Sequence, residues 1–185
     1  MTFSEFLLAD DSENLRDYME SIDRIEPIPD LFFNRLSDKL KTYFVTGGMP
    51  EAVKTWTEDH DVSELDEVLE EIIYTYERDM GKHPDKNDIP KIHYIWDSLP
   101  SQLAKDNRKF MYSAVREGAR AREYENALNW LVDAGILRKV YLIQKPDIPI
   151  EAYRDLSSFK VYYNDIGIMR RKSHIQASVF MDDQK

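Results

Sequence analysis

Residues 116–143 read REGARAREYENALNWLVDAGILRKVYLI and predict a helix that is followed almost directly by a strand. Gly135 suits the residue just after a helix, because glycine readily adopts the left-handed conformation that ends many helices. The run 136–143 is rich in β-branched and aromatic residues, which favours a strand. The helix, expected over residues 116–135, carries on one face Tyr124, Ala127, Leu128, Leu131 and Val132.

Elements on both sides of this stretch complete the order of a winged helix. Upstream, residues 85–100 show the apolar spacing of a helix, and residues 109–112 (KFMY) predict a short strand. Downstream, residues 159–163 (FKVYY) predict a second long strand after a proline-containing loop. Helix, helix, strand, loop and strand is the order of a winged helix. We therefore expect a winged-helix-like α/β unit with a small antiparallel sheet over residues 85–169.

The first 84 residues predict a bundle of helices. The most regular pattern lies in residues 65–76, where apolar side chains recur at i, i+3, i+4, i+7, i+8 and i+11. Ser63 is the expected N-cap of that helix. An earlier helix is expected to end at Gly47-Gly48, and Pro50 suits the first turn of the next one.

The expected domain boundaries follow from composition. Residues 81–88 (GKHPDKND) are the weakest seam, so we place a boundary after residue 84. Residues 170–185 are polar and are expected to form a tail without a partner element. The predicted fold class is therefore mostly α, with a helical bundle (1–84), a winged-helix-like unit (85–169) and a polar tail (170–185).

The composition narrows the classes of function. The chain has 185 residues and a formal net charge of −10, which repels nucleic acid and anionic membranes at long range. It contains no cysteine, which excludes disulfides and thiolate chemistry. No apolar run approaches the length of a transmembrane helix, and the N-terminus lacks the features of a secretory signal. We expect a cytoplasmic protein without a membrane partner.

The motifs predict no catalytic residues, no metal site and no cofactor held by this chain alone. A phosphate-binding loop requires G-x-x-x-x-G-K-[ST], which is absent. The four histidines are scattered along the chain and form no H-E-x-x-H motif; they are His60, His83, His93 and His174. Nothing converges on a nucleophile, so we expect no enzymatic activity from the chain on its own.

A local run of cations stands out in this acidic sequence. The candidates for phosphate contact are Arg116, Arg120 and Arg122, which lie at or before the expected recognition helix. Lys105, Arg108 and Lys109 add to the run, whereas Glu117, Glu123 and Glu125 interleave with it and cancel much of its charge. DNA binding and an ion-paired helix face are both consistent with this pattern.

Five segments, in order, resemble one family. They are residues 1–7 (MTFSEFL), 47–53 (GGMPEAV), 99–105 (LPSQLAK) with 109–110, 118–124 (GARAREY) with 127–131 and 134–136, and 159–162 (FKVY) with 164–168 (NDIGI). Together they resemble the predicted bacterial and archaeal ATPases of the AAA superfamily whose core is followed by a domain of uncharacterised function. Each motif is weak alone, but five in order are specific, and the resemblance extends to about residue 169.

The resemblance implies that this chain corresponds to a central fragment of such an ATPase, with a helical lid and a winged helix. In that family the nucleotide-binding motifs precede the segment similar to residues 1–7, and a nuclease-like region follows the segment similar to residues 165–168. The implied partner is therefore the missing N-terminal ATPase core, and ATP is the implied cofactor of the intact parent. Gly47, Gly48 and Pro50 resemble the glycine-x-proline turn that related signalling ATPases place against the nucleotide.

Three functions are consistent with the sequence. The leading one is a non-catalytic regulatory segment that couples the nucleotide state of the parent ATPase to a partner. The second is a DNA-binding winged-helix module that uses the three arginines. The third is a protein-interaction or self-association domain, whose aromatic surface would lie around Tyr74, Tyr76, Trp96 or Tyr163.

Overall fold

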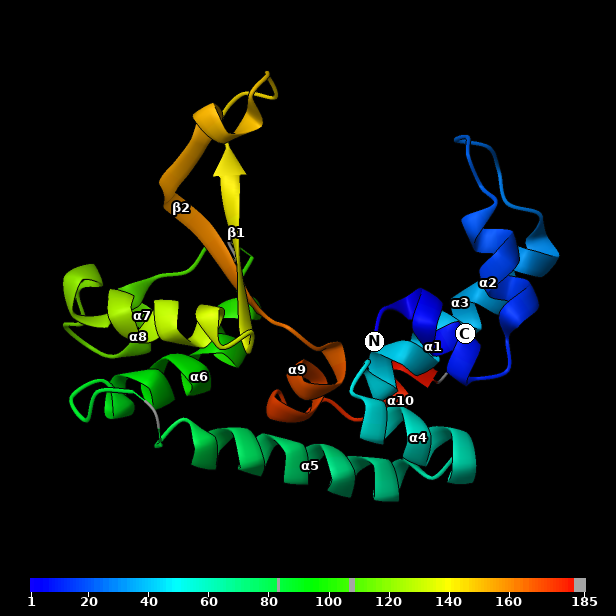
Figure 1. The fold of residues 1–185 in the computed structure, drawn as a ribbon, viewed down its shortest axis with the longest axis horizontal. Helices are drawn as coiled ribbons and strands as arrows, with labels where there is room; N and C mark the ends of the chain where they lie inside the picture. The colour runs from blue at the N-terminus through cyan, green and yellow to red at the C-terminus, as the bar shows by residue number, and fades with distance from the viewer. Residues whose placement is uncertain (83, 107–108, 182–185) are drawn as a thin grey trace. The chain divides into compact units, whose positions relative to one another are not determined.

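The computed structural model describes residues 1–82, 84–106 and 109–181, and this part of the chain is mostly helical. It contains one sheet of two antiparallel strands, so the expected fold class is confirmed (Figure 1). The helices are α1 (Phe3–Ala9), α2 (Glu13–Glu20), α3 (Asp30–Thr46), α4 (Pro50–Asp59), α5 (Val62–Asp79), α6 (Ile89–Leu103), α7 (Tyr112–Val115), α8 (Ala121–Asp133), α9 (Ile166–Lys172) and α10 (Ser178–Met181). The strands are β1 (Leu137–Ile143) and β2 (Arg154–Tyr163), and the short 3-10 helix η1 (Ile150–Tyr153) lies between them.

The chain divides into two compact units. The first unit comprises Met1–Tyr74 and Asp165–Lys185, and the second unit comprises Thr75–Asn164. The divisions therefore fall after Tyr74 and after Asn164, whereas the sequence led us to expect boundaries after residues 84 and 169. The difference has a physical reason, because α9 and α10 pack on α3, and no local pattern signals such contacts.

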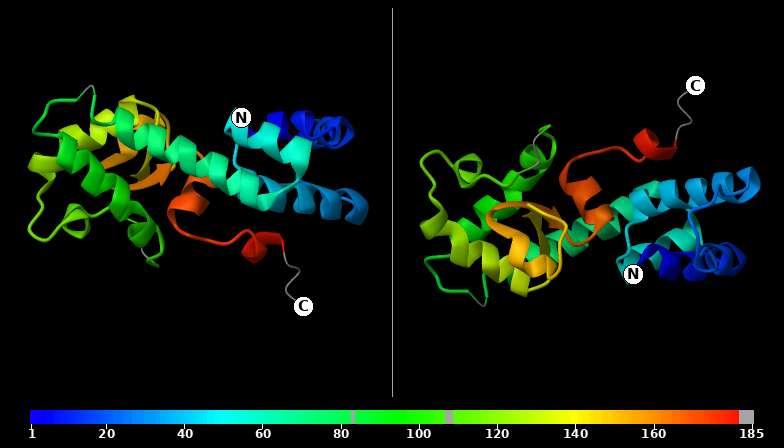
Figure 2. Two further views of the ribbon diagram at one scale, coloured as in Figure 1. Left: turned by 90° about the horizontal axis from the view of Figure 1, so that it is seen from below. Right: turned by 90° about the horizontal axis from the view of Figure 1, so that it is seen from above.

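The first unit is built around α3. Helices α1, α2 and α3 lie side by side, as the blue helices of Figure 2 show, and α4, α9 and α10 also contact α3. Fully burying a large apolar side chain stabilises a fold by about 1.5–3 kcal/mol. The buried cluster that supplies this stabilisation consists of Phe6, Val45, Ala52, Val53, Trp56, Leu65, Leu69 and Ala177.

The helix ends in the first unit follow the expected signals with one exception. α3 ends at Thr46, immediately before Gly47, and Pro50 is the first residue of α4, as predicted. The predicted cap of α5 is wrong, because the helix begins at Val62 rather than after Ser63. The carboxylate of Asp61 accepts a hydrogen bond from the Ser63 backbone N–H at 2.6 Å, which satisfies a free donor of the first turn.

The segment that we expected to be a tail without partners is part of the first unit. Arg170 lies in α9 and is fully buried, and α10 contacts α3. The expectation of an unpartnered polar tail is therefore wrong over the described residues 170–181, while residues 182–185 lie outside the described residues. The cause is long-range pairing of the arginine, which the local polarity of the sequence does not indicate.

The second unit has the element order of a winged helix. Helix α6 packs against α7 and α8, and α8 packs against β1. The strands pair from Leu137 opposite Tyr163 to Ile143 opposite Arg154, with an irregularity after Tyr141. The ring of Tyr163 meets the ring of Trp96 edge-on, with centroids 4.8 Å apart.

A buried tyrosine joins the sheet of the second unit to α6. The Tyr163 hydroxyl donates a hydrogen bond to the backbone carbonyl of Trp96 at 2.9 Å. Burial raises the pKa of Tyr163, because the ionised phenolate would lose its hydration. The Trp96 indole N–H in turn donates to the Glu77 carboxylate at 2.9 Å.

Three local predictions in the second unit need correction. Residues 109–112 are not a strand, since α7 already begins at Tyr112, although the Phe110 N–H donates to the Phe159 carbonyl at 2.9 Å. α8 begins at Ala121 rather than at residue 116, because Arg116 and Arg120 are extended and Gly118 has a φ of +77°. α6 covers Ile89–Leu103 and continues through Pro100, whereas the apolar spacing predicted a helix over residues 85–100.

Candidate functional site

The turn between α3 and α4 is the site that the sequence singled out. Gly47 has a φ of +72° and a ψ of −164°, a conformation that L side chains strongly disfavour. Gly48, the next residue, donates its backbone N–H to the Asp165 carboxylate at 2.7 Å. The turn therefore presents a backbone donor to an anionic oxygen just before α4 begins.

Asp165 connects this turn to α9. Its other carboxylate oxygen accepts a hydrogen bond from the Ile168 N–H at 3.0 Å and so caps α9. The contact is close on both sides, since a Cβ atom on Gly47 would lie 2.3 Å from Asp165, and one on Gly167 would lie 2.5 Å from the Thr46 carbonyl. Only glycine at these two positions allows the backbones to approach so closely.

The structure thus places the three predicted nucleotide-facing residues in different surroundings. Gly47 and Gly48 are buried against other segments of the first unit, whereas Pro50 is exposed. The donor that a phosphate would use on Gly48 is held by Asp165. Their role toward nucleotide stays a prediction, and it now requires that a phosphate displaces this carboxylate.

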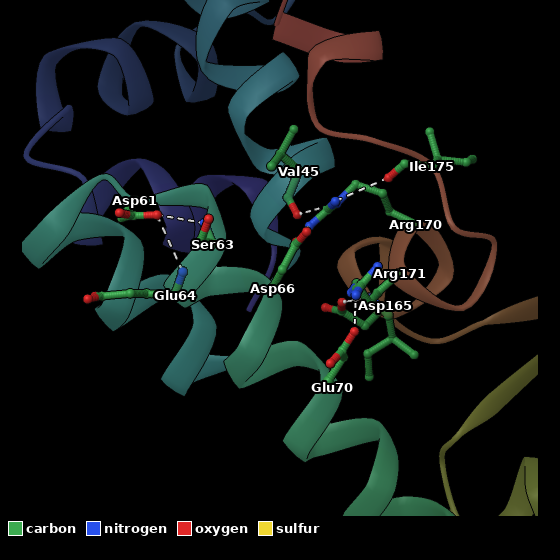
Figure 3. A network of polar contacts seen from close by, with 11 residues as sticks. Val45, Asp61, Ser63, Glu64, Asp66, Glu70, Asp165, Arg170, Arg171 and Ile175 are labelled. Carbon is green, nitrogen blue, oxygen red and sulfur yellow. Dashed lines mark hydrogen bonds and ion pairs between the residues drawn. The ribbon is translucent and has the colours of Figure 1, made fainter.

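Arg170 is the most buried charged side chain among the described residues, and it anchors α9 (Figure 3). Its Nε donates to the Val45 carbonyl at 2.9 Å, and one terminal nitrogen donates to the Ile175 carbonyl at 3.2 Å. The other terminal nitrogen forms an ion pair with Asp66. A buried guanidinium is tolerated only when its donors are satisfied in this way.

A second arginine extends the same network to α5. Arg171 forms an ion pair with Glu70, which Figure 3 shows next to Asp66 on that helix. The spacing of four between Asp66 and Glu70 puts both carboxylates on one helix face. We did not predict this network, although the run Arg170-Arg171-Lys172 and this spacing are the two signals that were present.

The three arginines proposed for DNA contact are all exposed. The Arg116 guanidinium lies over the Tyr94 ring, 5.1 Å from its centroid, and Arg122 lies 3.9 Å from the Glu123 carboxylate. Arg120 is the N-cap of α8, and among the described residues it has no carboxylate partner. The structure therefore leaves all three at the surface near the start of α8, whereas Arg108 lies outside the described residues.

Charge is divided very unevenly between the two units. Thr75–Asn164 contains 15 Lys and Arg against 13 Asp and Glu, a net charge of +2. The first unit contains the remaining 10 Lys and Arg against 22 Asp and Glu, a net charge of −12. The acidic balance of the whole chain therefore gives no argument against a cation-bearing surface on the second unit.

The four aromatic residues proposed as candidates for an interaction surface differ in exposure. Trp96 and Tyr163 are buried, Tyr76 is half-buried, and Tyr74 is exposed. Trp96 and Tyr163 instead belong to the core of the second unit. The predicted aromatic surface is therefore wrong for these two residues, because their ring contacts and hydrogen bonds are internal.

Metal-binding side chains do not gather in the described part of the chain. Within residues 1–82, 84–106 and 109–181, no group of three His, Asp or Glu side chains could hold a metal ion. His83 lies outside the described residues. None of the helices in these ranges has the length and apolar character of a membrane span.

Comparison with known proteins identifies a family. The family described as "Domain of unknown function (DUF8612)" matches residues 37–178, which is more than half of the chain and includes α4 to α9. The chain belongs to this family. No curated protein and no solved structure matches the chain. In this member of the DUF8612 family, the matched region contains the Gly47-Gly48 turn, Asp165 and Arg170.

Proposed function

We propose that this DUF8612 chain is a non-catalytic regulatory segment of a larger cytoplasmic ATPase. The first unit would act as the lid that responds to nucleotide, and the winged-helix-like second unit would engage a partner. The resemblance of five ordered segments to AAA-superfamily ATPases supports the parent protein and its missing N-terminal core. The absence of cysteine fits the reducing cytoplasm.

One contact carries this proposal, the hydrogen bond from the Gly48 N–H to the Asp165 carboxylate. A phosphate oxygen is an anionic acceptor of the same kind, and the start of a helix favours such an acceptor through its free N–H groups and dipole. A nucleotide that took this donor would release Asp165, which also caps α9. Binding would then favour one arrangement of α9 over another, as coupling requires.

We expect Asp165→Asn to raise nucleotide affinity in the intact ATPase that contains this chain. The neutral amide accepts a hydrogen bond more weakly than a carboxylate, by about 1 kcal/mol, so nucleotide affinity should rise roughly fivefold. Equilibrium binding of a fluorescent ATP analogue measures this change.

Two further results are expected from the proposed function. Azido-ATP should label the peptide that contains residues 47–50 of the intact protein. The isolated chain should release no phosphate from ATP.

The control for this test is Asp38→Asn, which removes an exposed carboxylate from the same unit and should leave nucleotide affinity unchanged. Equal affinities of wild type and Asp165→Asn would contradict the proposed competition. Labelling confined to peptides far from residues 47–50 would refute the predicted role of Gly47, Gly48 and Pro50. Hydrolysis of ATP by the isolated chain would refute the non-catalytic assignment.

DNA binding by the second unit is the other candidate function, and the uneven division of charge favours it. This unit carries a net charge of +2 although the whole chain carries −10. Arg116, Arg120 and Arg122 lie exposed near the start of α8, which is the helix that enters the major groove in many winged helices.

For this candidate we expect duplex DNA to bind the chain with an affinity that falls steeply with salt. Replacing the three arginines with alanine should reduce the slope of log K against log salt by roughly 0.9 for each phosphate that is no longer neutralised. Fluorescence anisotropy with labelled duplex measures both quantities. Arg24, Arg35 and Lys54 are exposed in the first unit, and replacing them with alanine should not change the slope. Absence of binding at low salt would eliminate this candidate.

A further inference from the structure

One edge of the two-stranded sheet is free. Asn164 donates its N–H to the Ile136 carbonyl at 3.0 Å, and hydrogen-bonded and non-hydrogen-bonded pairs alternate along an antiparallel ladder. The backbone groups of Lys139 and Tyr141 therefore face away from β2. Among the described residues, no backbone group outside β2 hydrogen-bonds to either of them. The edge of β1 can thus accept another strand.

The opposite edge of the sheet supports this geometry. Phe159 pairs with Tyr141 in the register, so its carbonyl also points away from the partner strand. That carbonyl accepts the Phe110 N–H at 2.9 Å. β2 is therefore covered at this position by the chain itself, and β1 is the strand with the available edge.

Space for an added strand lies along β1. A hollow of about 490 Å³ lies between α8 and β1, and its lining includes Asn129, Val132, Lys139 and Tyr141. A second hollow of about 450 Å³ is lined by both strands and by Lys109, and its lining includes Val140, Leu142, Lys160 and Tyr162. The hollow between α8 and β1 thus lies beside the free edge.

The outer face of the hairpin combines exposed apolar and basic side chains. Val140 and Leu142 are 51% and 53% exposed. Arg138 lies two residues before Val140 on β1, and Lys160 pairs with Val140 on β2, so both exposed cations share this face. Exposed apolar side chains on a strand with a free edge are what a bound peptide strand covers. The exposed side chains of Val140 and Leu142 would add no affinity for a nucleic-acid backbone, which is polar and charged.

The charge of this surface selects an acidic occupant. The segments 137–143 and 159–163 contain Arg138, Lys139 and Lys160 but no Asp or Glu, in a chain whose net charge is −10. Arg138 donates to the Asn164 side chain at 2.7 Å, and neither Arg138 nor Lys160 has a carboxylate partner among the described residues. The acidic residues next to this surface are Asp155, which lies opposite Leu142 and accepts hydrogen bonds from Ser157, and Asp133, which lines the hollow on the α8 side.

We propose that the free edge of β1 binds an extended segment of a partner protein as a third strand. This segment alternates acidic and apolar residues on the side that faces Val140 and Leu142. Its backbone pairs with Lys139 and Tyr141, its carboxylates approach Arg138 and Lys160, and its apolar side chains cover the exposed valine and leucine. The interaction goes beyond the proposed function, because it uses only the second unit and needs no nucleotide.

The test uses the full chain and a capped peptide with the pattern Glu-Thr-Val-Thr-Glu-Thr-Val, which is as long as β1 and in which glutamate and valine alternate on one face of the strand. Isotope-labelled chain titrated with this peptide should show shifted and exchange-protected amides at Lys139 and Tyr141. The same peptide with lysine in place of each glutamate should bind at least about tenfold more weakly, because it repels the basic face. Equal affinity for the two peptides, or shifts confined to other residues, would overturn the proposal.

Two pairs of variants separate charge from backbone pairing. R138E/K160E should weaken binding of the glutamate–valine peptide at least about tenfold, whereas K86E/K105E makes the same charge change at exposed sites elsewhere and should leave it unchanged. K139P removes the N–H at the free edge and should abolish binding, while K139A retains that N–H and most of the affinity. Duplex DNA that bound the same amides more tightly than the peptide would assign the surface to nucleic acid and refute the proposal.

Discussion

Replacing Arg170 with methionine should lower the free energy of unfolding by about 3 kcal/mol, because removing one partner of a buried ion pair leaves the other uncompensated. The substitution keeps the apolar volume but removes the donors to the Val45 and Ile175 carbonyls and the partner of Asp66. The side chain of Asp66 is 27% exposed, so water can hydrate its carboxylate once the guanidinium is gone. The expected loss of stability is therefore at the lower end of the range for buried ion pairs. Urea denaturation followed by circular dichroism measures the change.

Two comparisons make this expectation specific. Arg35 is exposed, and Arg35→Met should change the free energy of unfolding by less than about 0.5 kcal/mol. Adding Asp66→Leu to Arg170→Met should recover part of the loss, because the uncompensated carboxylate is then removed as well. A cost below about 1 kcal/mol for Arg170→Met would show that the network does not hold α9 in place.

Gly47→Ala should cost more than about 3 kcal/mol, since backbone strain of about 1–3 kcal/mol adds to a steric conflict of similar size. The added methyl would lie 2.3 Å from Asp165 and 2.7 Å from the Gly167 backbone nitrogen. Neither neighbour can move without breaking the hydrogen bond between Gly48 and Asp165 or the close approach of α9. Thermal and urea unfolding should both detect the loss.

Gly135→Ala is the matched control for this substitution. Gly135 has the same φ of +72°, but a Cβ atom there would meet nothing within 4 Å. Gly135→Ala should therefore lower the free energy of unfolding only by the backbone strain, about 1–2 kcal/mol. Similar losses at the two positions would mean that the α3–α4 turn does not make a tight contact with α9.

The elements that could be predicted from the sequence are those with strong local signals. α5 has the most regular apolar spacing, β1 is rich in β-branched and aromatic residues, and Pro50 marks the start of α4. The start of α8 was wrong because Gly118 adopts a positive φ and Arg120 is extended, and neither is visible from apolar spacing. Local patterns therefore gave the fold class and most elements, but not all of their ends.

The candidate site could be predicted only in part, for reasons of distance along the chain. The two glycines were found, because a helix stop is a local signal. Their partner Asp165 lies 117 residues after Gly48, and Arg170 lies 125 residues after Val45, so no spacing rule connects them. The surroundings of these residues arise from tertiary contacts, and the sequence alone placed Arg170 in a tail.

The division of the chain also has a consequence for its synthesis. The second unit is one continuous segment, whereas the first unit needs residues from both before Tyr74 and after Asn164. A ribosome therefore synthesises all of the second unit before it adds Asp165 or Arg170. The helices that precede Tyr74 are made first, but their core is completed only when the residues after Asn164 have been added.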